Sequence, residues 1–114
     1  MKFGHLELFV RNPQLSREFY SHFGFELVAD QGSDFTWIKS GDAEFLLRKH
    51  DVRHDAPYGS TGPAIVLYTS DLPAAMRALS EKGLTPAACD RGEECCPLYR
   101  DPDGNWIQLV DPSV

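Results

Sequence analysis

Histidine and carboxylate side chains near the start of the chain have the types and spacing that metal binding or proton transfer requires. His5 and Glu7 are separated by one residue, and the amide side chain of Gln108 stands near the other end of the sequence. Imidazole and carboxylate groups bind divalent metals, and an imidazole can also act as a general base near neutral pH. His5 is therefore a candidate for a ligand contact, a general base, or a structural side chain hydrogen-bonded to Gln108 or to water.

A second group of metal-binding residue types lies in the middle of the chain. His50 and His54 stand next to Asp51 and Asp55. The surrounding residues 50–62 are rich in Gly, Pro and Ser, which indicates a loop. We expect this cluster to be a solvated surface, with metal binding as the alternative.

The three cysteines, Cys89, Cys95 and Cys96, are an odd number and include an adjacent pair. Neighbouring residues in a strand point to opposite faces and make poor disulfide partners. We therefore expect reduced thiols that behave as small hydrophobic side chains.

Composition narrows the class of protein. Hydrophobic residues make up 42% of the 114 residues and charged residues 25%, as in an ordinary globular domain. The net charge of −6, with no run of Lys or Arg, argues against nucleic acid as a partner. No apolar stretch approaches the length of a membrane span or of a signal peptide core, so we expect no membrane partner and a cytoplasmic protein.

An internal repeat organises the chain. Shifting the sequence by 59 positions lays residues 5–10 over residues 64–69, and a helical segment follows in each half. Asn12 and Asp71 are expected helix N-caps, each followed closely by a proline, and glycine ends each helix. In the first helix the expected apolar stripe is Leu15, Phe19, Tyr20 and Phe23.

Three strand-like runs follow each helix, at residues 25–30, 34–39 and 42–49 in the first half and 85–90, 94–100 and 105–110 in the second. The chain is thus predicted to be a single α+β domain over residues 1–114. It would contain a βαβββ module at 1–49, a linker at 50–62 and a second βαβββ module at 63–114. Strand alternation places one apolar set against the helices: Leu6, Leu8, Phe45, Leu47, Ile65, Leu67, Ile107 and Leu109.

Two sequence signatures resemble the vicinal oxygen chelate superfamily, the glyoxalase/bleomycin resistance protein/dioxygenase-like proteins. The first joins residues 4–10 to Phe19-Tyr20-Ser21-His22-Phe23-Gly24-Phe25, and the second is residues 99–109, with Asp101-Pro102-Asp103-Gly104-Asn105 at its turn. The resemblance implies two βαβββ modules that form an open, cup-like, eight-stranded mixed sheet. It also implies a ligand in the cup and a homodimer.

The resemblance further implies four metal-ligand positions, which fall here on His5, Leu46, Ala64 and Gln108. Leu and Ala donate nothing to a cation, so we expect no metal cofactor. If a divalent metal binds, His5 and Gln108 are the remaining ligands, and Glu7 or Glu44 could substitute for the missing ones. The Cys95-Cys96 pair resembles the thiol pair of arsenic-handling members, which leaves metalloid binding as another alternative.

The cup-facing positions combine aromatic rings with a few charges, as a small-molecule site requires. The expected ligand-binding residues are His5, Glu7, Phe9, Trp37, Glu44, Leu46, Arg48, Tyr68, Trp106 and Gln108. The acidic members favour a cationic ligand. We expect a metal-free small-molecule binding protein that could sequester an antibiotic. The alternative is an enzyme, a metal-dependent lyase, isomerase or dioxygenase with an atypical ligand set, and the sequence leaves open whether the protein is catalytic.

Overall fold

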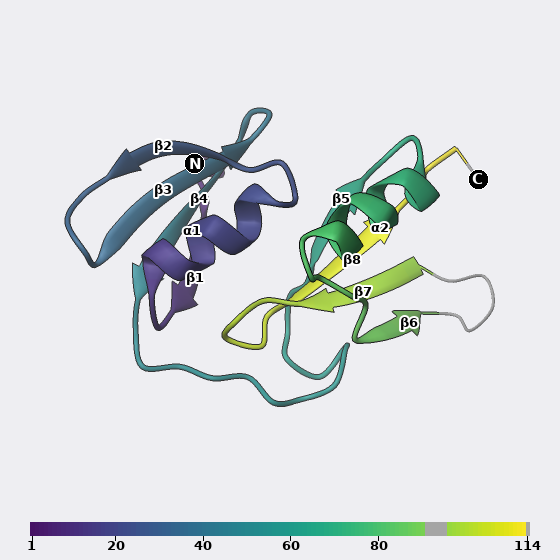
Figure 1. The fold of residues 1–114 in the computed structure, drawn as a ribbon. Helices are drawn as coiled ribbons and strands as arrows, with labels where there is room; N and C mark the ends of the chain where they lie inside the picture. Colours follow the sequence, from purple (N-terminus) through teal and green to yellow (C-terminus); the bar gives the residue numbers. More distant parts are fainter. Residues whose placement is uncertain (91–95, 114) are drawn as a thin grey trace. The chain divides into compact units, whose positions relative to one another are not determined.

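The structure is a computed structural model, and it describes residues 1–90 and 96–113. The chain divides into two compact units, residues 1–53 and 54–114, which we call the N-terminal and C-terminal modules. Each module contains one four-stranded mixed sheet and one helix in βαβββ order (Figure 1). The predicted α+β class with two duplicated modules is confirmed. Within the described residues, no helix has the length and apolar character needed to cross a membrane.

The N-terminal module has the strand order β1-β4-β3-β2, in which β1 and β4 are parallel and the other pairs are antiparallel. Its elements are β1 (Leu6–Val10), α1 (Pro13–Ser21), β2 (Glu26–Asp30), β3 (Phe35–Ser40) and β4 (Ala43–Lys49). Each observed strand begins and ends within about one residue of its predicted range, because Gly41 and the other turn residues mark the boundaries clearly in the sequence.

Helix α1 begins and ends where the sequence indicates. The side chain of Asn12 accepts hydrogen bonds from the backbone N–H groups of Gln14 and Leu15, and Gly24 adopts a φ of +89° just after the helix. The buried face, however, consists of Pro13, Ser16 and Tyr20. These residues are three and four positions apart and therefore share one helix face, which contacts β3 and β4.

The prediction that Leu15 belongs to the apolar stripe of the first helix is wrong. Leu15 is 50% exposed. It stands one residue before Ser16, about 100° around the helix, and so turns toward solvent when Ser16 faces the sheet. Ser16 is fully buried in its place.

The C-terminal module repeats the topology, with the strand order β5-β8-β7-β6. Its elements are β5 (Ile65–Tyr68), α2 (Leu72–Glu81), β6 (Ala88–Asp90), β7 (Cys96–Arg100) and β8 (Trp106–Val110). Asp71 caps α2 by accepting a hydrogen bond of 3.0 Å from the N–H of Ala74. Strand β6 is shorter than its predicted range, and residues 94 and 95 of the predicted β7 lie outside the described residues.

Strand register confirms how the two halves align. Leu6 pairs with Phe45 in the parallel β1–β4 ladder, and Ile65 pairs with Ile107 in the parallel β5–β8 ladder. Phe45 therefore corresponds to Ile107, and the next residues, Leu46 and Gln108, occupy equivalent places. This alignment was uncertain by one residue in the sequence, because the Asp-Pro-Asp-Gly turn is longer than its counterpart.

The cysteine expectation is wrong for one residue. Cys89 is disulfide-bonded, whereas Cys96 has a free thiol. Cys95 lies outside the described residues. Adjacency makes only a bond between Cys95 and Cys96 unfavourable, and Cys89, six or more residues away in the chain, is not restricted in this way.

Candidate functional site

One face of the N-terminal sheet brings together aromatic and charged side chains from three strands. Cross-strand register aligns Phe9, Arg48 and Phe35 in one row and Glu7, Leu46 and Trp37 in the next. Side chains on one sheet face alternate with those on the other, so these two rows share a face. We call the six residues the aromatic face. His5 and Glu44, also predicted site residues, lie just before β1 and near the start of β4.

The register settles the position of Trp37, which the sequence placed only loosely. Trp37 pairs with Leu46 and donates from its indole nitrogen to Gln31 Oε1 at 3.2 Å. The imidazole of exposed His5 lies against it, with ring centroids 4.6 Å apart and planes inclined by 68°. This edge-to-face arrangement places His5 at the border of the aromatic face, where it can contact a bound molecule.

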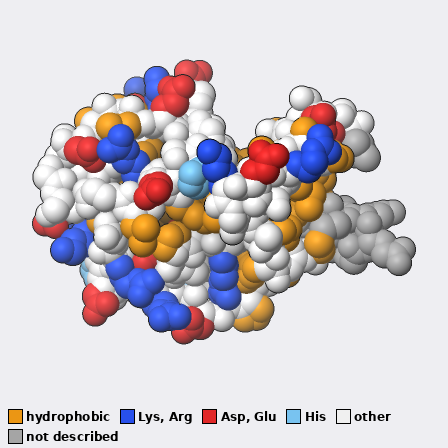
Figure 2. Space-filling model, viewed as in Figure 1, with side chains coloured by type: hydrophobic (Ala, Val, Ile, Leu, Met, Phe, Trp, Pro, Cys, Tyr) orange, Lys and Arg blue, Asp and Glu red, His pale blue; other side chains and the backbone are white. Residues whose placement is uncertain are grey.

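Basic side chains lie next to the carboxylates of this surface. Arg48 Nη1 donates to Glu7 Oε1 at 2.9 Å, and the guanidinium carbon lies 5.4 Å from the centroid of the Phe35 ring. Glu44 lies directly opposite Lys39 in the β3–β4 ladder. The acidic character that the sequence suggested for a cationic ligand is therefore offset by basic neighbours. Acidic and basic side chains are interspersed over the visible surface (Figure 2).

In the C-terminal module, part of the linker covers the corresponding sheet face. The indole N–H of Trp106 donates to the backbone oxygen of Ala56 at 3.1 Å, and the ring of Tyr58 meets Trp106 edge to face at 5.9 Å. Tyr58 also donates from its hydroxyl to Gln108 Oε1 at 3.4 Å. Trp106 and Gln108 are consequently only 5% and 8% exposed. We call residues 54–58 the covering segment.

Arg100 holds the covering segment from a second direction. Its guanidinium lies 4.2 Å from the centroid of the Trp106 ring, within range of a cation–π interaction. Its nitrogens donate to the backbone oxygens of Gly104 and Ala56. Arg100, Ala56 and Tyr58 could not be singled out from the sequence, because their roles depend on contacts between segments about 50 residues apart. The one sequence feature that could have drawn attention to Arg100 is the Asp-Pro-Asp-Gly turn that follows it.

The turn before β8 fits closely against the covering segment. The backbone N–H of His54 donates to the oxygen of Asp103 at 2.8 Å. Gly104 has a φ of +90°, and a Cβ atom at this position would overlap with the backbone oxygen of His54. The carboxylate of Asp101 fixes the turn by accepting from the N–H groups of Asp103 and Asn105. Glycine is therefore required at position 104 both for its φ and for close approach.

The remaining predicted residue, Tyr68, lies on β5 at the edge of the C-terminal sheet. It is 75% exposed and pairs with Val110 rather than with Trp106 or Gln108. Its neighbour on the same face, Val66, is 45% exposed. These side chains form an apolar edge beside the covered part of the module.

The donor set at the four implied metal positions does not fit a divalent ion well. Leu46 and Ala64 supply no donor, and the Gln108 oxygen accepts from Tyr58. Protein sites for catalytic metals generally use at least three side-chain ligands. Within residues 1–90 and 96–113, no three His, Cys, Asp or Glu side chains are grouped so that they could hold a metal ion. His50, one of the two histidines in the His/Asp cluster of residues 50–55, packs edge to face against Phe9, with the ring centroids 5.5 Å apart.

Comparison with protein families identifies the chain. The family model described as the Glyoxalase/Bleomycin resistance protein/Dioxygenase superfamily matches residues 2–109. The chain belongs to this superfamily. A search of curated proteins found no match.

Solved structures of this superfamily share the fold. A possible glyoxalase from Bacillus cereus has a TM-score of 0.73 at 20% identity, with 96% of this chain and 98% of that chain covered. A lactoylglutathione lyase from Agrobacterium tumefaciens has a TM-score of 0.72 at 20% identity, with coverage of 98% and 94%. A bleomycin-binding protein in complex with bleomycin has a TM-score of 0.68 at 19% identity, with coverage of 97% and 98%. At these identities the similarity establishes the fold, while function depends on the site.

Proposed function

We propose that the protein binds a small organic molecule on the aromatic face of its N-terminal module, without a metal ion. The observation that carries the proposal is the alignment of Phe9, Phe35 and Trp37 with the paired charges of Glu7 and Arg48 on one sheet face. Flat rings bury ligand area with little loss of side-chain entropy, and polar groups at fixed positions orient the bound molecule.

Exposure and charge support binding without chemistry. Phe9 is 39% exposed, and with the half-buried rings of Phe35 and Trp37 it presents aromatic surface to solvent on one sheet face. The surface has no reactive nucleophile among its six residues, and its two charged side chains, Glu7 and Arg48, pair with each other. Sequestration of a toxic molecule such as an antibiotic needs affinity only, so it is compatible with the loss of metal ligands.

A metal-dependent lyase, isomerase or dioxygenase is the alternative function. His5 favours it, because this exposed imidazole occupies the first of the metal positions that the superfamily resemblance implies. In that case His5 would bind the ion and carboxylates such as Glu7 or Glu44 would complete the set. The metal would act as a Lewis acid on vicinal substrate oxygens.

The experiment separates the two functions by metal content and ligand binding. The protein is purified with and without EDTA, its metal content is measured by plasma mass spectrometry, and its melting temperature is recorded with bleomycin, catechol and a dicarbonyl–thiol adduct. We expect at least one compound to raise the melting temperature of the EDTA-treated protein, since binding to the native state stabilises it. Stoichiometric bound metal, or stabilisation only after nickel, manganese or iron is added, would support the enzyme instead.

A homodimer is a further part of the proposal. Val66 and Tyr68 expose apolar surface on the edge strand β5, where a second copy of the chain would remove it from water. Light scattering coupled to size-exclusion chromatography measures the mass directly. A monomeric mass at concentrations up to about 100 µM, where a weak complex of micromolar affinity would already form, would contradict this part.

Residence in the cytoplasm stays a prediction from the sequence. The disulfide of Cys89 argues against a strongly reducing compartment, because cytosolic thiols are normally kept reduced. Cell fractionation combined with thiol labelling of Cys89 tests location and oxidation state together.

A further inference from the structure

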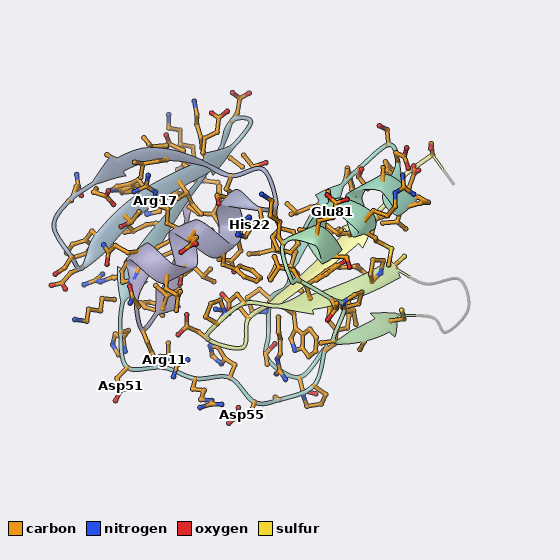
Figure 3. All side chains as sticks on the ribbon, in the orientation of Figure 1. Arg11, Arg17, His22, Asp51, Asp55 and Glu81 are labelled. Carbon is orange, nitrogen blue, oxygen red and sulfur yellow. The ribbon has the colours of Figure 1, made fainter. Side chains whose placement is uncertain are left out.

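A cavity of about 660 Å³ adjoins the aromatic face at the end of the sheet where β1 and β4 terminate. This volume is within the range typical of small-molecule sites. All of its lining residues belong to the N-terminal module: Arg11, Asp34, Phe35, Arg48, Lys49, His50 and Asp51. Figure 3 shows the labelled Arg11 and Asp51 at this end of the module, beyond β1. Phe35 and Arg48 belong to both the cavity and the aromatic face, so one ligand can occupy both.

The cavity concentrates basic side chains in a protein that is acidic overall. Arg11, Arg48 and Lys49 line it together with His50, against the carboxylates of Asp34 and Asp51. Three cationic side chains face two carboxylates, and Arg48 also pairs with Glu7, so the lining is close to neutral, whereas the chain as a whole carries a net charge of −6. Because Arg48 is already paired, attraction of an anion to this cavity depends on Lys49 and Arg11.

Lys49 is placed to bind an anion. Its backbone N–H donates to Asp34 at 2.8 Å, which fixes the end of β4 against the start of β3. Its exposed ammonium group forms no ion pair with any residue in the described part of the chain. The next residue, His50, is held to β1 by a backbone hydrogen bond of 2.9 Å to Val10. Two basic groups therefore project from a rigid strand end and not from a free loop.

We propose that this cavity binds the anionic group of the ligand, a carboxylate or a phosphate, while an aromatic or other flat part of the same molecule lies on the aromatic face. This inference rests on the proposed binding function and names its ligand class: small aromatic anions. Lys49, Arg11 and His50 supply charge-assisted hydrogen bonds to the anion, which are stronger than neutral ones. The ring of Phe35, adjacent to the cavity, supports the flat part of the molecule.

Binding of three probes by titration calorimetry tests the inference. Benzoate and phenyl phosphate carry the two candidate anions on one ring, and benzamide is the neutral match. We expect at least one anion to bind about tenfold more tightly than benzamide, because a hydrogen bond to a charged group is worth roughly one factor of ten or more. The preferred anion identifies the group that the cavity accepts. Its affinity should fall as NaCl rises from 20 to about 300 mM.

Matched variants locate the anion. Lys49→Gln should weaken binding of the preferred anion by about tenfold and leave benzamide binding unchanged. Lys39→Gln removes the same charge from the same sheet about five residues away along the strand direction, roughly 17 Å, which is beyond the screening length at physiological salt. It should have no effect. Circular dichroism and the melting temperature of each variant confirm that it is folded.

The outcomes distinguish this inference from the binding function on which it rests. Equal binding of benzamide and the anions, with no effect of Lys49→Gln, would overturn the anion site but leave the aromatic face as a binding surface. No binding of any of the three probes would also overturn the inference. In that case, stabilisation by an unrelated compound in the thermal screen would still uphold the binding function.

Discussion

Arg48 and Glu7 form an ion pair across the parallel strands β4 and β1, with a distance of 2.9 Å between Nη1 and Oε1. Both side chains are partly exposed, at 48% and 33%. The pair therefore contributes little to stability, and its effect is on the charge of the aromatic face.

Neutralising Glu7 tests this view. Glu7→Gln should lower the free energy of unfolding by less than about 1 kcal/mol, measured by urea titration, because the pair is screened by solvent. It should strengthen binding of the preferred aromatic anion by about threefold at low salt, since Arg48 is then unopposed. Glu26→Gln, on the exposed edge strand β2, is the control for charge alone. A loss of several kcal/mol on Glu7→Gln would show that the pair is structural.

Replacing Gly104 should destabilise the protein strongly. In Gly104→Ala the new methyl group would overlap with the backbone oxygen of His54 and the residue would keep a φ of +90°. We expect a loss of more than about 3 kcal/mol, because backbone strain of this kind alone costs about 1–3 kcal/mol. Gly62→Ala has the same φ of +90° with nothing within 4 Å. The difference between the stability losses of the two variants measures the cost of the overlap between the new methyl group and the His54 oxygen. Equal losses in the two variants would show that this overlap has no effect on stability.

The hydrogen bond between Trp106 and Ala56 should hold the covering segment in place. Trp106→Phe removes the indole N–H but keeps an aromatic ring beside Arg100 and Tyr58. We expect a loss of about 1–2 kcal/mol in unfolding free energy and faster hydrogen exchange of the His54 amide. The effect stays moderate because the Ala56 oxygen still accepts from Arg100. Unchanged exchange at His54 would show that the segment is held by the turn alone.

Tyr99 should make stability depend on alkaline pH. This side chain is 2% exposed, and burial raises the pKa of its hydroxyl above the usual 10.0. Above pH 10 the unfolded chain therefore loses this proton before the folded protein does, so the folded state binds more protons and stability falls as pH rises. Below pH 10 the group is neutral in both states and the contribution is fully present.

The Tyr99→Phe variant removes this dependence. Urea unfolding between pH 8 and 11 should show a decline above pH 10 for the unmodified protein that is smaller in the variant. Tyr68→Phe, at an exposed position, should leave the decline unchanged. Identical pH profiles for the unmodified protein and Tyr99→Phe would mean that other groups cause the alkaline instability.

Local signals in the sequence were enough to predict the elements and their topology. Asn12 and Asp71 cap their helices as expected, since an N-cap needs only its own side chain and the next two or three N–H groups. The period-two alternation fixed the faces of β1, β4 and β8, because a strand face is determined once one residue is placed. The register then placed Trp37 beside Leu46, which alternation in β3 alone had left uncertain.

Contacts between distant segments could not be predicted in the same way. Trp106 and Gln108 were expected in a ligand cavity, and whether they contact a ligand stays untested. The structure shows that Ala56 and Tyr58 from the linker already occupy their hydrogen-bonding groups. Nothing in the local composition of residues 54–58 indicates this packing. The cavity beside Lys49 likewise depends on strand ends that only the folded sheet brings together.

Two-dimensional NMR shows which residues of the protein a bound ligand contacts, and so whether the ligand lies on the aromatic face. A ¹⁵N-labelled, EDTA-treated sample is titrated with the compound that gives the largest thermal stabilisation. We expect chemical-shift changes concentrated at residues 7–11 and 35–50, which saturate with ligand and need no added metal. Shift changes confined to the C-terminal module, or appearing only after a divalent ion is supplied, would contradict it.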